Sequence, residues 1–451
     1  MKKTYEIDMC NGPLFGKILT FSIPLMLSGI LQLLFNAADT IVVGRFAGST
    51  SLAAVGSTTS LINLLTNLFI GLSVGANVLT AQFYGAKKDR EVSDTIHSAI
   101  LIAFIGGILL LILGLSVTRQ ILVLMGTPAD VLDLASLYLK IYFLGMPAML
   151  LYNFGSSILR AIGDTRRPLY YLSAAGVINI ILNLVLVINF RLGVAGVAIA
   201  TVTSQTISAL LIIKCLTQLK GSCHLDLRKL RFDKNKSAQI IRIGLPAGLQ
   251  GTVFSLSNVL IQSSVNSFGS IAMAGNTAGM NIEGFVYVAM NTFQQTAMSF
   301  ISQNFGAGKQ DRIRKIMFLC LGMVAVVGLV LGNGAYLIGR PLLSIYSSDT
   351  EVIEYGLLRM SIICTFYCLC GIMDVMVGIL RGIGYSFMPM IVSLLGACGL
   401  RILWIFTIFQ WNRSLLCLYI SYPVTWAITS LAHMICYAIV RKKQLQRLRS
   451  R

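Results

Sequence analysis

Charged residues are scarce in this sequence of 451 residues, where Asp, Glu, Lys and Arg together make up 12%. Soluble domains usually carry about 25% charged residues, so the composition argues against a soluble enzyme. The 9 prolines and 41 glycines are too few for a collagen-like chain, and 10 cysteines are too few for a disulfide scaffold of this length. Hydrophobic residues make up 56%, which excludes a disordered chain. The composition therefore predicts a membrane protein that crosses the bilayer several times.

Motifs for binding nucleotide phosphates, dinucleotides and zinc are missing. Most cysteines lie in apolar runs, where cysteine packs as a small hydrophobic residue. The cluster Cys364, Cys368 and Cys370 has no histidine or carboxylate beside it at metal-binding spacing. We therefore predict no cofactor and no firmly bound metal, so that any work done across the membrane draws on an ion gradient.

Apolar runs of membrane-spanning length recur along the chain. A spanning helix needs about 20 apolar residues, within a range of roughly 17–25. This measure predicts twelve spans, at about residues 18–41, 53–81, 96–117, 137–158, 169–189, 194–216, 243–266, 274–303, 316–337, 356–379, 389–410 and 415–439. No short apolar run with a small-residue cleavage site follows the N-terminus, so we interpret the first run as a retained span.

Basic residues gather on one side of the predicted spans. Of the 36 Lys and Arg residues, 28 fall in the N-terminal segment, in every second loop and in the C-terminal tail, and 8 fall on the other side. The positive-inside rule places the richer side in the cytoplasm, with both termini. The net charge of +19 is therefore interpreted as topology and not as nucleic-acid binding. The basic tail, residues 441–451, is expected to contact anionic lipid.

The two halves of the chain repeat each other. Pro24 corresponds to Pro246 at an offset of 222 residues, and LRAIGDTRRP (159–168) corresponds to LRGIGYSFMP (380–389) at an offset of 221. Because each repeat holds an even number of spans, both copies have the same orientation and should be related by a pseudo-twofold axis along the membrane normal. Two such bundles enclose a cavity, an arrangement that suits alternating access.

This organisation predicts an all-α polytopic membrane protein with twelve transmembrane helices in two six-helix bundles. The predicted parts are an N-lobe (1–216), a cytoplasmic linker (217–242), a C-lobe (243–440) and the basic tail (441–451). Each repeat pair is complete in one chain, so a functional monomer is expected. Two GxxxG pairs, Gly71/Gly75 and Gly378/Gly382, predict close packing between helices.

Several segments together resemble the MATE transporters (multidrug and toxic compound extrusion), a bacterial-type branch of a superfamily that also contains lipid-linked sugar flippases. They are IPLMLSGILQLLFNAADTIVVGRFAG (23–48), AQFYGAKKDRE (81–91), NFGSSILRAIGDTRRP (153–168), INIILNLVLVINFRLGVAGVAIATVTSQ (178–205) and their second-half copies. The resemblance covers nearly the whole chain. It implies a multi-pass protein of the bacterial plasma (inner) membrane.

Only three of the seventeen carboxylates lie inside predicted spans: Asp39, Glu283 and Asp374. An acid near the centre of a spanning helix costs about 2.5–3.5 kcal/mol, and such residues usually serve a function. Asp39 is the first candidate, because it matches the span-one acid that couples ion movement to export in the resembled family. The alternative is an inert, solvated helix-end Asp. The resemblance also implies that span one bends near Pro24; the alternative is a first-turn proline.

Three polar residues of spans five and six complete the candidate coupling site. Asn179 and Asn183 are four residues apart and share a helix face, and Thr201 follows in the next span. Their oxygens suit a hard cation, so a weak Na⁺ site is predicted with Asp39. The position of Asn183 is often Asp in the family, and the missing second acid favours H⁺ over Na⁺. The alternative role is hydrogen bonding between helices.

The second half contributes a candidate C-lobe cavity lined by Asp374, Glu283 and Gln250. Asp374 lies one turn after the family's better-known acid position, which is Cys370 here. Glu283 either faces the cavity or lies solvated near the outer surface. Gln250 stands nearest the place of a span-seven Glu found in one sodium-coupled branch, a second departure that favours H⁺.

The resemblance, together with these residues, implies a secondary antiporter that exports amphipathic, often cationic, organic compounds in exchange for H⁺ or Na⁺. The main alternative is a flippase for a lipid-linked sugar, which would need basic residues for pyrophosphate; the spans offer only Arg401 and Arg359. An intramembrane enzyme would need clustered catalytic residues, which the sequence lacks. A channel is disfavoured because no ring of acids is present.

Overall fold

The computed structural model describes residues 5–449, and in this range the chain is helical throughout, without a strand. The first half contains α1 (Leu14–Phe46), α2 (Ser49–Gly85), α3 (Asp89–Leu124), α4 (Ala129–Leu144), α5 (Met146–Ala161), α6 (Arg166–Asn183), the π-helix η1 (Leu184–Asn189), α7 (Gly193–Gln218) and the short 3₁₀ helices η2 (Gly221–Cys223) and η3 (Leu227–Lys229). The second half contains α8 (Lys234–Asn266), α9 (Ser270–Gly306), α10 (Gln310–Leu337), α11 (Gly339–Ser344), α12 (Thr350–Ile363), α13 (Tyr367–Gly382), α14 (Phe387–Ser393), the π-helix η4 (Leu394–Gly399), α15 (Leu400–Phe406), α16 (Ile408–Trp411) and α17 (Leu415–Arg449). The predicted basic tail begins inside α17, and its last two positions, 450 and 451, lie outside the described residues.

The helices account for the twelve predicted spans. Ten spans meet the length and hydropathy criteria when each sharply bent helix pair is taken as one span. The two remaining long helices, α8 with 33 residues and α9 with 37, bring the number to twelve. The predicted fold class, an all-α polytopic membrane protein built from two repeats, is confirmed.

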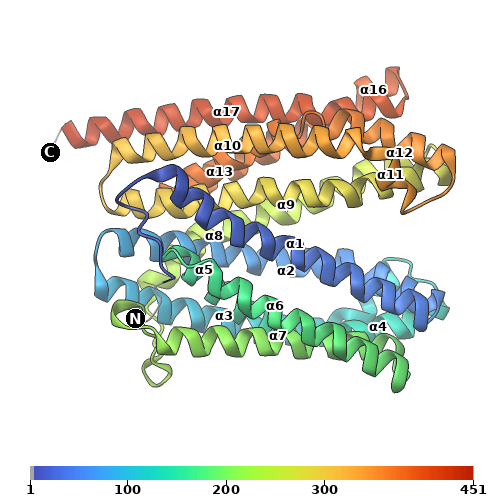
Figure 1. Cartoon of the computed structure of the whole chain (residues 1–451), viewed down its shortest axis with the longest axis horizontal. Helices are drawn as coiled ribbons and strands as arrows, with labels where there is room; N and C mark the ends of the chain where they lie inside the picture. The colour runs from blue at the N-terminus through green and yellow to red at the C-terminus, as the bar shows by residue number, and fades with distance from the viewer. Residues whose placement is uncertain (1–4, 450–451) are drawn as a thin grey trace. The chain divides into compact units, whose positions relative to one another are not determined.

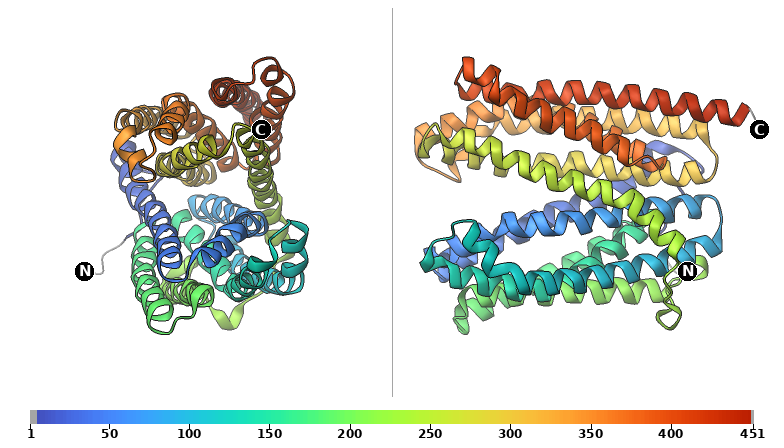
Figure 2. Two further views of the ribbon diagram at one scale, coloured as in Figure 1. Left: turned by 90° about the vertical axis from the view of Figure 1, so that its right-hand side faces the viewer. Right: turned by 180° about the vertical axis from the view of Figure 1, so that it is seen from behind.

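The described chain divides into two compact units. Among the described residues, the first unit holds 5–11 and 23–248, and the second holds 12–22 and 249–449. Within each unit the long helices run side by side, as the ribbon views show (Figures 1 and 2). The first turns of helix α1 therefore belong to the second unit and the rest of it to the first. The first half of α8, up to Gly248, belongs to the first unit and the rest to the second.

Each shared helix carries a proline close to the residue where it passes between the units. Pro24 lies inside α1, ten residues after its start, and Pro246 lies inside α8. The first-turn placement considered for Pro24 is therefore wrong. An interior proline removes one backbone hydrogen bond of the helix and favours a kink.

One span in each repeat is broken at the same relative position. Helices α4 and α5 meet at a bend of 48°, and α12 and α13 meet at a bend of 50°. Gly145 lies between the first pair and Phe366 between the second, which matches the repeat offset of 221 residues. Pro147 at the start of α5 suits a new helix start after the break.

Glycines allow the close helix contacts that the GxxxG pairs predict. A Cβ on Gly71 of α2 would lie 2.2 Å from the Cα of Gly248, and one on Gly75 would lie 2.1 Å from the carbonyl oxygen of Ile240, both in α8. A Cβ on Gly378 of α13 would lie 2.5 Å from a backbone oxygen of α9. The predicted role of these pairs in close packing is confirmed.

The segment between the repeats contains the short helices η2 and η3 and the first turns of α8. Helix α8 begins at Lys234 and not near 243, because Asp233 caps it: its side chain accepts a hydrogen bond of 2.9 Å from the backbone N–H of Lys236. Arg231 and Lys236 form ion pairs with Asp94 and Glu91 of α3. These contacts bind the segment to the first unit.

Candidate ion and substrate site

The first unit brings together the four residues predicted as the coupling site. Asp39 comes from α1, Asn179 and Asn183 from α6, and Thr201 from α7. The Asn183 amide donates hydrogen bonds to Asp39 Oδ1 and, over 3.1 Å, to Asn179 Oδ1. Thr201 Oγ1 donates to Asp39 Oδ2 over 3.2 Å. Both carboxylate oxygens of Asp39 thus accept from neutral donors.

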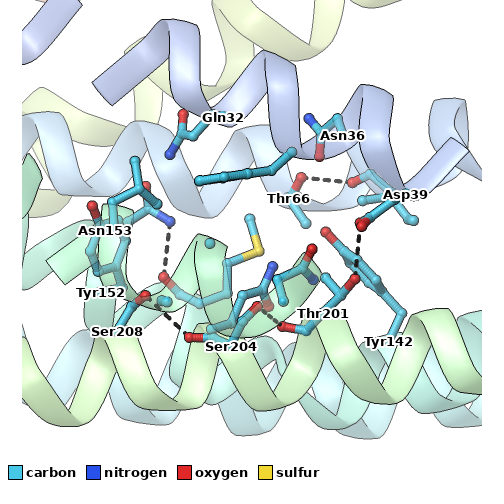
Figure 3. Close-up of a pocket in the computed structure, with 18 of the residues that line it drawn as sticks. Gln32, Asn36, Asp39, Thr66, Tyr142, Tyr152, Asn153, Thr201, Ser204 and Ser208 are labelled. Atoms are coloured by element: carbon cyan, nitrogen blue, oxygen red, sulfur yellow. Dashed lines mark hydrogen bonds between the residues drawn. The ribbon is translucent and has the colours of Figure 1, made fainter. Parts of the chain in front are cut away.

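A cavity of about 360 Å³ opens beside this cluster within the first unit (Figure 3). Asp39 points into it, with Thr201 and Tyr142 nearby and Gln32 and Asn36 above on α1. The lining residues come from six helices and are Gln32, Phe35, Asn36, Asp39, Ile62, Asn63, Thr66, Asn67, Ile70, Tyr142, Met149, Tyr152, Asn153, Leu172, Ala175, Gly176, Asn179, Thr201, Ser204, Gln205 and Ser208. Amides, hydroxyls and aromatic rings dominate this wall.

The lining carries one carboxylate and no basic side chain. Among the described residues Asp39 takes part in no ion pair. It is half-buried and lines the cavity, and its role in coupling stays a prediction. A lone acid in a membrane-embedded cavity attracts a cation. Burial also favours the neutral form of a carboxyl group, so a proton or an organic cation can satisfy such a site.

Oxygen atoms around Asp39 would also suit a small hard cation. Asn179 Oδ1, Thr201 Oγ1 and the carboxylate lie together, and Asn183 Oδ1 is buried without a hydrogen-bond partner. Carbonyl, hydroxyl and carboxylate oxygens are the ligands that hard cations prefer. No group of three or more His, Cys, Asp or Glu that could hold a metal occurs in the part of the chain that was described.

Glu283 is held in an ion pair in the second unit. Arg359 donates to its two oxygens over 2.8 Å and 2.7 Å, and donates to Asn276 Oδ1 over 2.8 Å. Glu283 is 5% exposed and Arg359 is 4% exposed. The solvated surface position considered for Glu283 is therefore wrong, because the carboxylate is buried and paired.

Asp374 and Gln250 lie on different helices of the second unit. Arg381 donates to Gln250 Oε1 over 2.8 Å, and its Nε has no partner. Asp374 is buried, and its Oδ2 also has no partner. The role of Asp374, Glu283 and Gln250 as a shared C-lobe cavity stays a prediction.

Sequence reasoning missed much of the cavity wall. Gln32 and Asn36 precede Asp39 by seven and three residues and therefore share its face of α1. Asn63, Thr66 and Asn67 follow the same helical spacing in α2. Polar residues at intervals of three and four inside an apolar run were the signal that could have revealed this wall.

Comparison with known proteins places these features in context. The family model MatE matches residues 24–185 and again 246–407, one match in each repeat. The chain is 29% identical over 437 residues to the probable multidrug resistance protein YoeA of Bacillus subtilis (strain 168), covering 95% of this chain and 94% of the relative. It is 28% identical over 357 residues to the FAD transporter of Shewanella oneidensis, covering 77% of each chain.

A solved structure supports the same fold. The crystal structure of MATE in complex with MaL6 superimposes with a TM-score of 0.92 at 20% identity, covering 99% of this chain and all of that chain. At this identity the likeness is one of fold.

Proposed function

Because the chain belongs to the MatE family, a family of transporters and not of enzymes, we propose that it exports amphipathic, often cationic, organic compounds in exchange for H⁺ or Na⁺ by alternating access. The observation that carries the proposal is the cavity of the first unit, in which Asp39 is the single charged group. A cationic substrate and a coupling ion would compete for this carboxylate, so that binding of one releases the other.

We favour H⁺ as the coupling ion. The position that would supply a second acid holds Asn183, a neutral donor that already binds Asp39. One carboxylate can take up and release one proton without further ligands. A sodium ion would need the oxygens of Asn179 and Thr201 as further ligands beside the carboxylate.

Reconstitution in liposomes tests this proposal. The uptake of ethidium, a fluorescent organic cation, would be followed under a pH gradient and, separately, under a sodium gradient. Uptake driven by the pH gradient supports H⁺ as the coupling ion. Uptake driven only by the sodium gradient contradicts H⁺ and supports Na⁺ as the coupling ion. Absence of uptake under both gradients contradicts the export of organic cations.

A second candidate is movement of a substrate that carries a pyrophosphate, as in a lipid-linked sugar flippase. The observation that favours it is the burial of Arg359, Arg381 and Arg401 in the second unit, against two buried acids there. The similarity to a protein named FAD transporter agrees with a pyrophosphate-bearing substrate. Transport of a lipid-linked sugar analogue without any ion gradient would favour this candidate.

The cellular setting follows from the same proposal. We place this multi-pass protein in the bacterial plasma membrane, with both termini in the cytoplasm and the basic residues of its tail against anionic lipid. We expect a functional monomer, because one chain holds both repeats of the family match.

A further inference from the structure

Arg401 is a buried cation of the second unit that pairs with no carboxylate among the described residues. Its side chain is 3% exposed, and it lies on α15 inside a predicted span. Nη2 donates to Thr425 Oγ1 over 3.1 Å, while Nε is buried with no hydrogen-bond partner. A charged group inside a membrane span is costly, and a guanidinium with an unmet donor is more so.

The neighbouring arginine shows what a satisfied guanidinium looks like in the same place. Arg359 donates to both oxygens of Glu283 and to Asn276. Both guanidinium groups lie over the ring of Tyr422, Arg359 at 5.5 Å and Arg401 at 4.0 Å from its centroid. The cluster thus holds two positive charges and one negative charge, and the excess charge is on Arg401.

Aromatic rings extend from this cluster. Tyr422 contacts Trp426 with ring centroids 5.6 Å apart, and Trp426 contacts Tyr367 at 5.4 Å. Aromatic faces and edges bind planar aromatic ligands, and a guanidinium binds carboxylate and phosphate oxygens with two parallel hydrogen bonds. The combination fits a ligand that joins a planar ring to an oxyanion.

We propose that Arg401, with Tyr422 and Thr425, forms an oxyanion subsite of the second unit that takes planar aromatic compounds bearing a phosphate or carboxylate. The ligand's oxyanion would accept hydrogen bonds from Nε and a terminal nitrogen of Arg401 and neutralise the excess charge. This extends the substrate range of the proposed export function, on which it rests, from cations to zwitterionic and anionic aromatic compounds.

Two flavins provide a matched pair of probes. Riboflavin and flavin mononucleotide share the isoalloxazine ring and differ by one phosphate. Their binding to the purified full chain in phosphatidylcholine nanodiscs would be measured by quenching of flavin fluorescence. We expect flavin mononucleotide to bind about tenfold or more tightly than riboflavin, because charged hydrogen bonds contribute more than neutral ones. Equal affinity of the two flavins would overturn the proposal.

Variants assign the preference to Arg401. Arg401→Gln should bring the affinity for flavin mononucleotide to that for riboflavin, Arg401→Lys should keep part of the preference, and Arg413→Gln, at an exposed position of the same unit, should keep all of it. Flavin mononucleotide should raise the melting temperature of the wild type but not that of Arg401→Gln. A cooperative melting transition of Arg401→Gln without ligand would show that the variant is folded. A preference that persists in Arg401→Gln would overturn the proposal.

Phosphatidylglycerol in the nanodiscs separates the two sources of a phosphate. If the lipid competes with flavin mononucleotide in the wild type, the subsite binds a lipid headgroup; if it does not, the subsite serves a soluble substrate. This binding assay uses no ion gradient. A preference for flavin mononucleotide that depends on Arg401, found without gradient-driven ethidium uptake, would therefore contradict ion-coupled export alone. Gradient-driven ethidium uptake without that preference would contradict the oxyanion subsite alone.

Discussion

Three acids lie within the predicted membrane spans, and their surroundings differ. Asp39 accepts hydrogen bonds from neutral side chains, Glu283 is bound by a guanidinium, and Asp374 keeps one buried oxygen without a partner. A neutral partner leaves the charge of a carboxylate uncompensated, whereas an arginine partner compensates it permanently. We therefore expect Asp39 to exchange cations and Glu283 to stabilise the second unit.

The Glu283–Arg359 pair leads to a prediction about stability. Glu283→Gln leaves Arg359 buried without its counter-charge, and breaking a buried ion pair from one side costs about 3–5 kcal/mol. We expect a clear fall in the melting temperature of the detergent-solubilised protein, followed by tryptophan fluorescence. The double variant Glu283→Leu with Arg359→Met should recover most of the loss. This account would be contradicted if Glu283→Gln melts at the same temperature as the wild type. It would also be contradicted if the double variant is folded but its melting temperature does not recover.

At the scale of helices, the contact between α2 and α8 depends on two glycines. Gly71→Ala would place a Cβ 2.2 Å from the backbone of Gly248, so the helices must separate. Overpacking costs about 1–3 kcal/mol, more than the gain of up to about 1 kcal/mol from replacing a helical glycine by alanine. Gly56→Ala is the matched control in the same helix, because no atom lies within 4 Å of its added Cβ.

We therefore expect opposite shifts of the melting temperature, downward for Gly71→Ala and slightly upward for Gly56→Ala. If the two variants shift in the same direction, the close contact does not limit stability.

Helix α1 provides a prediction about movement. Its first turns are held in the second unit, where Ser22 and Thr296 share a hydrogen bond of 2.9 Å and Phe21 meets Phe300, and the helix carries Asp39 in the first unit. Pro24 lies two residues after Ser22, so we expect α1 to bend there during transport. Pro24→Ala should slow ion-driven ethidium uptake while leaving equilibrium ethidium binding unchanged.

Pro423→Ala is the matched control, since Pro423 also lies inside a long helix, α17. Equal slowing by both variants would show a general effect of straightening helices and would remove the special role of Pro24.

For the whole molecule, the spans and the repeat can be predicted because both depend only on the order of residues along the chain. Apolar length marks a span, and a constant offset marks a repeat. The pairing of Glu283 with Arg359 joins residues 76 positions apart, and no periodicity within one helix encodes a contact between two helices. The approach of Asp39 to Asn183 and Thr201 was predicted through the family resemblance, not through spacing. The start of α8 could have been predicted as well, because Asp233 is a residue type that favours the N-cap position of a helix.

The orientation of the whole chain is open to a labelling test. Lys229→Cys lies in the segment between the repeats and Ser348→Cys between α11 and α12, and both positions are exposed. With a membrane-impermeant maleimide on intact cells, we expect Ser348→Cys to react and Lys229→Cys to react only after lysis. A Cys10→Ser background limits reaction at a native, partly exposed thiol. The reverse labelling pattern would invert the proposed topology.

The most direct test of the central claim is a measurement of protons released when substrate binds. Purified protein in weakly buffered detergent solution would be titrated with ethidium while the pH is recorded, beside Asp39→Asn and the exposed control Asp133→Asn. If a proton and the organic cation compete for Asp39, the wild type and Asp133→Asn release protons on binding and Asp39→Asn does not. Ethidium binding to the wild type without proton release, or equal release from Asp39→Asn, would contradict the account.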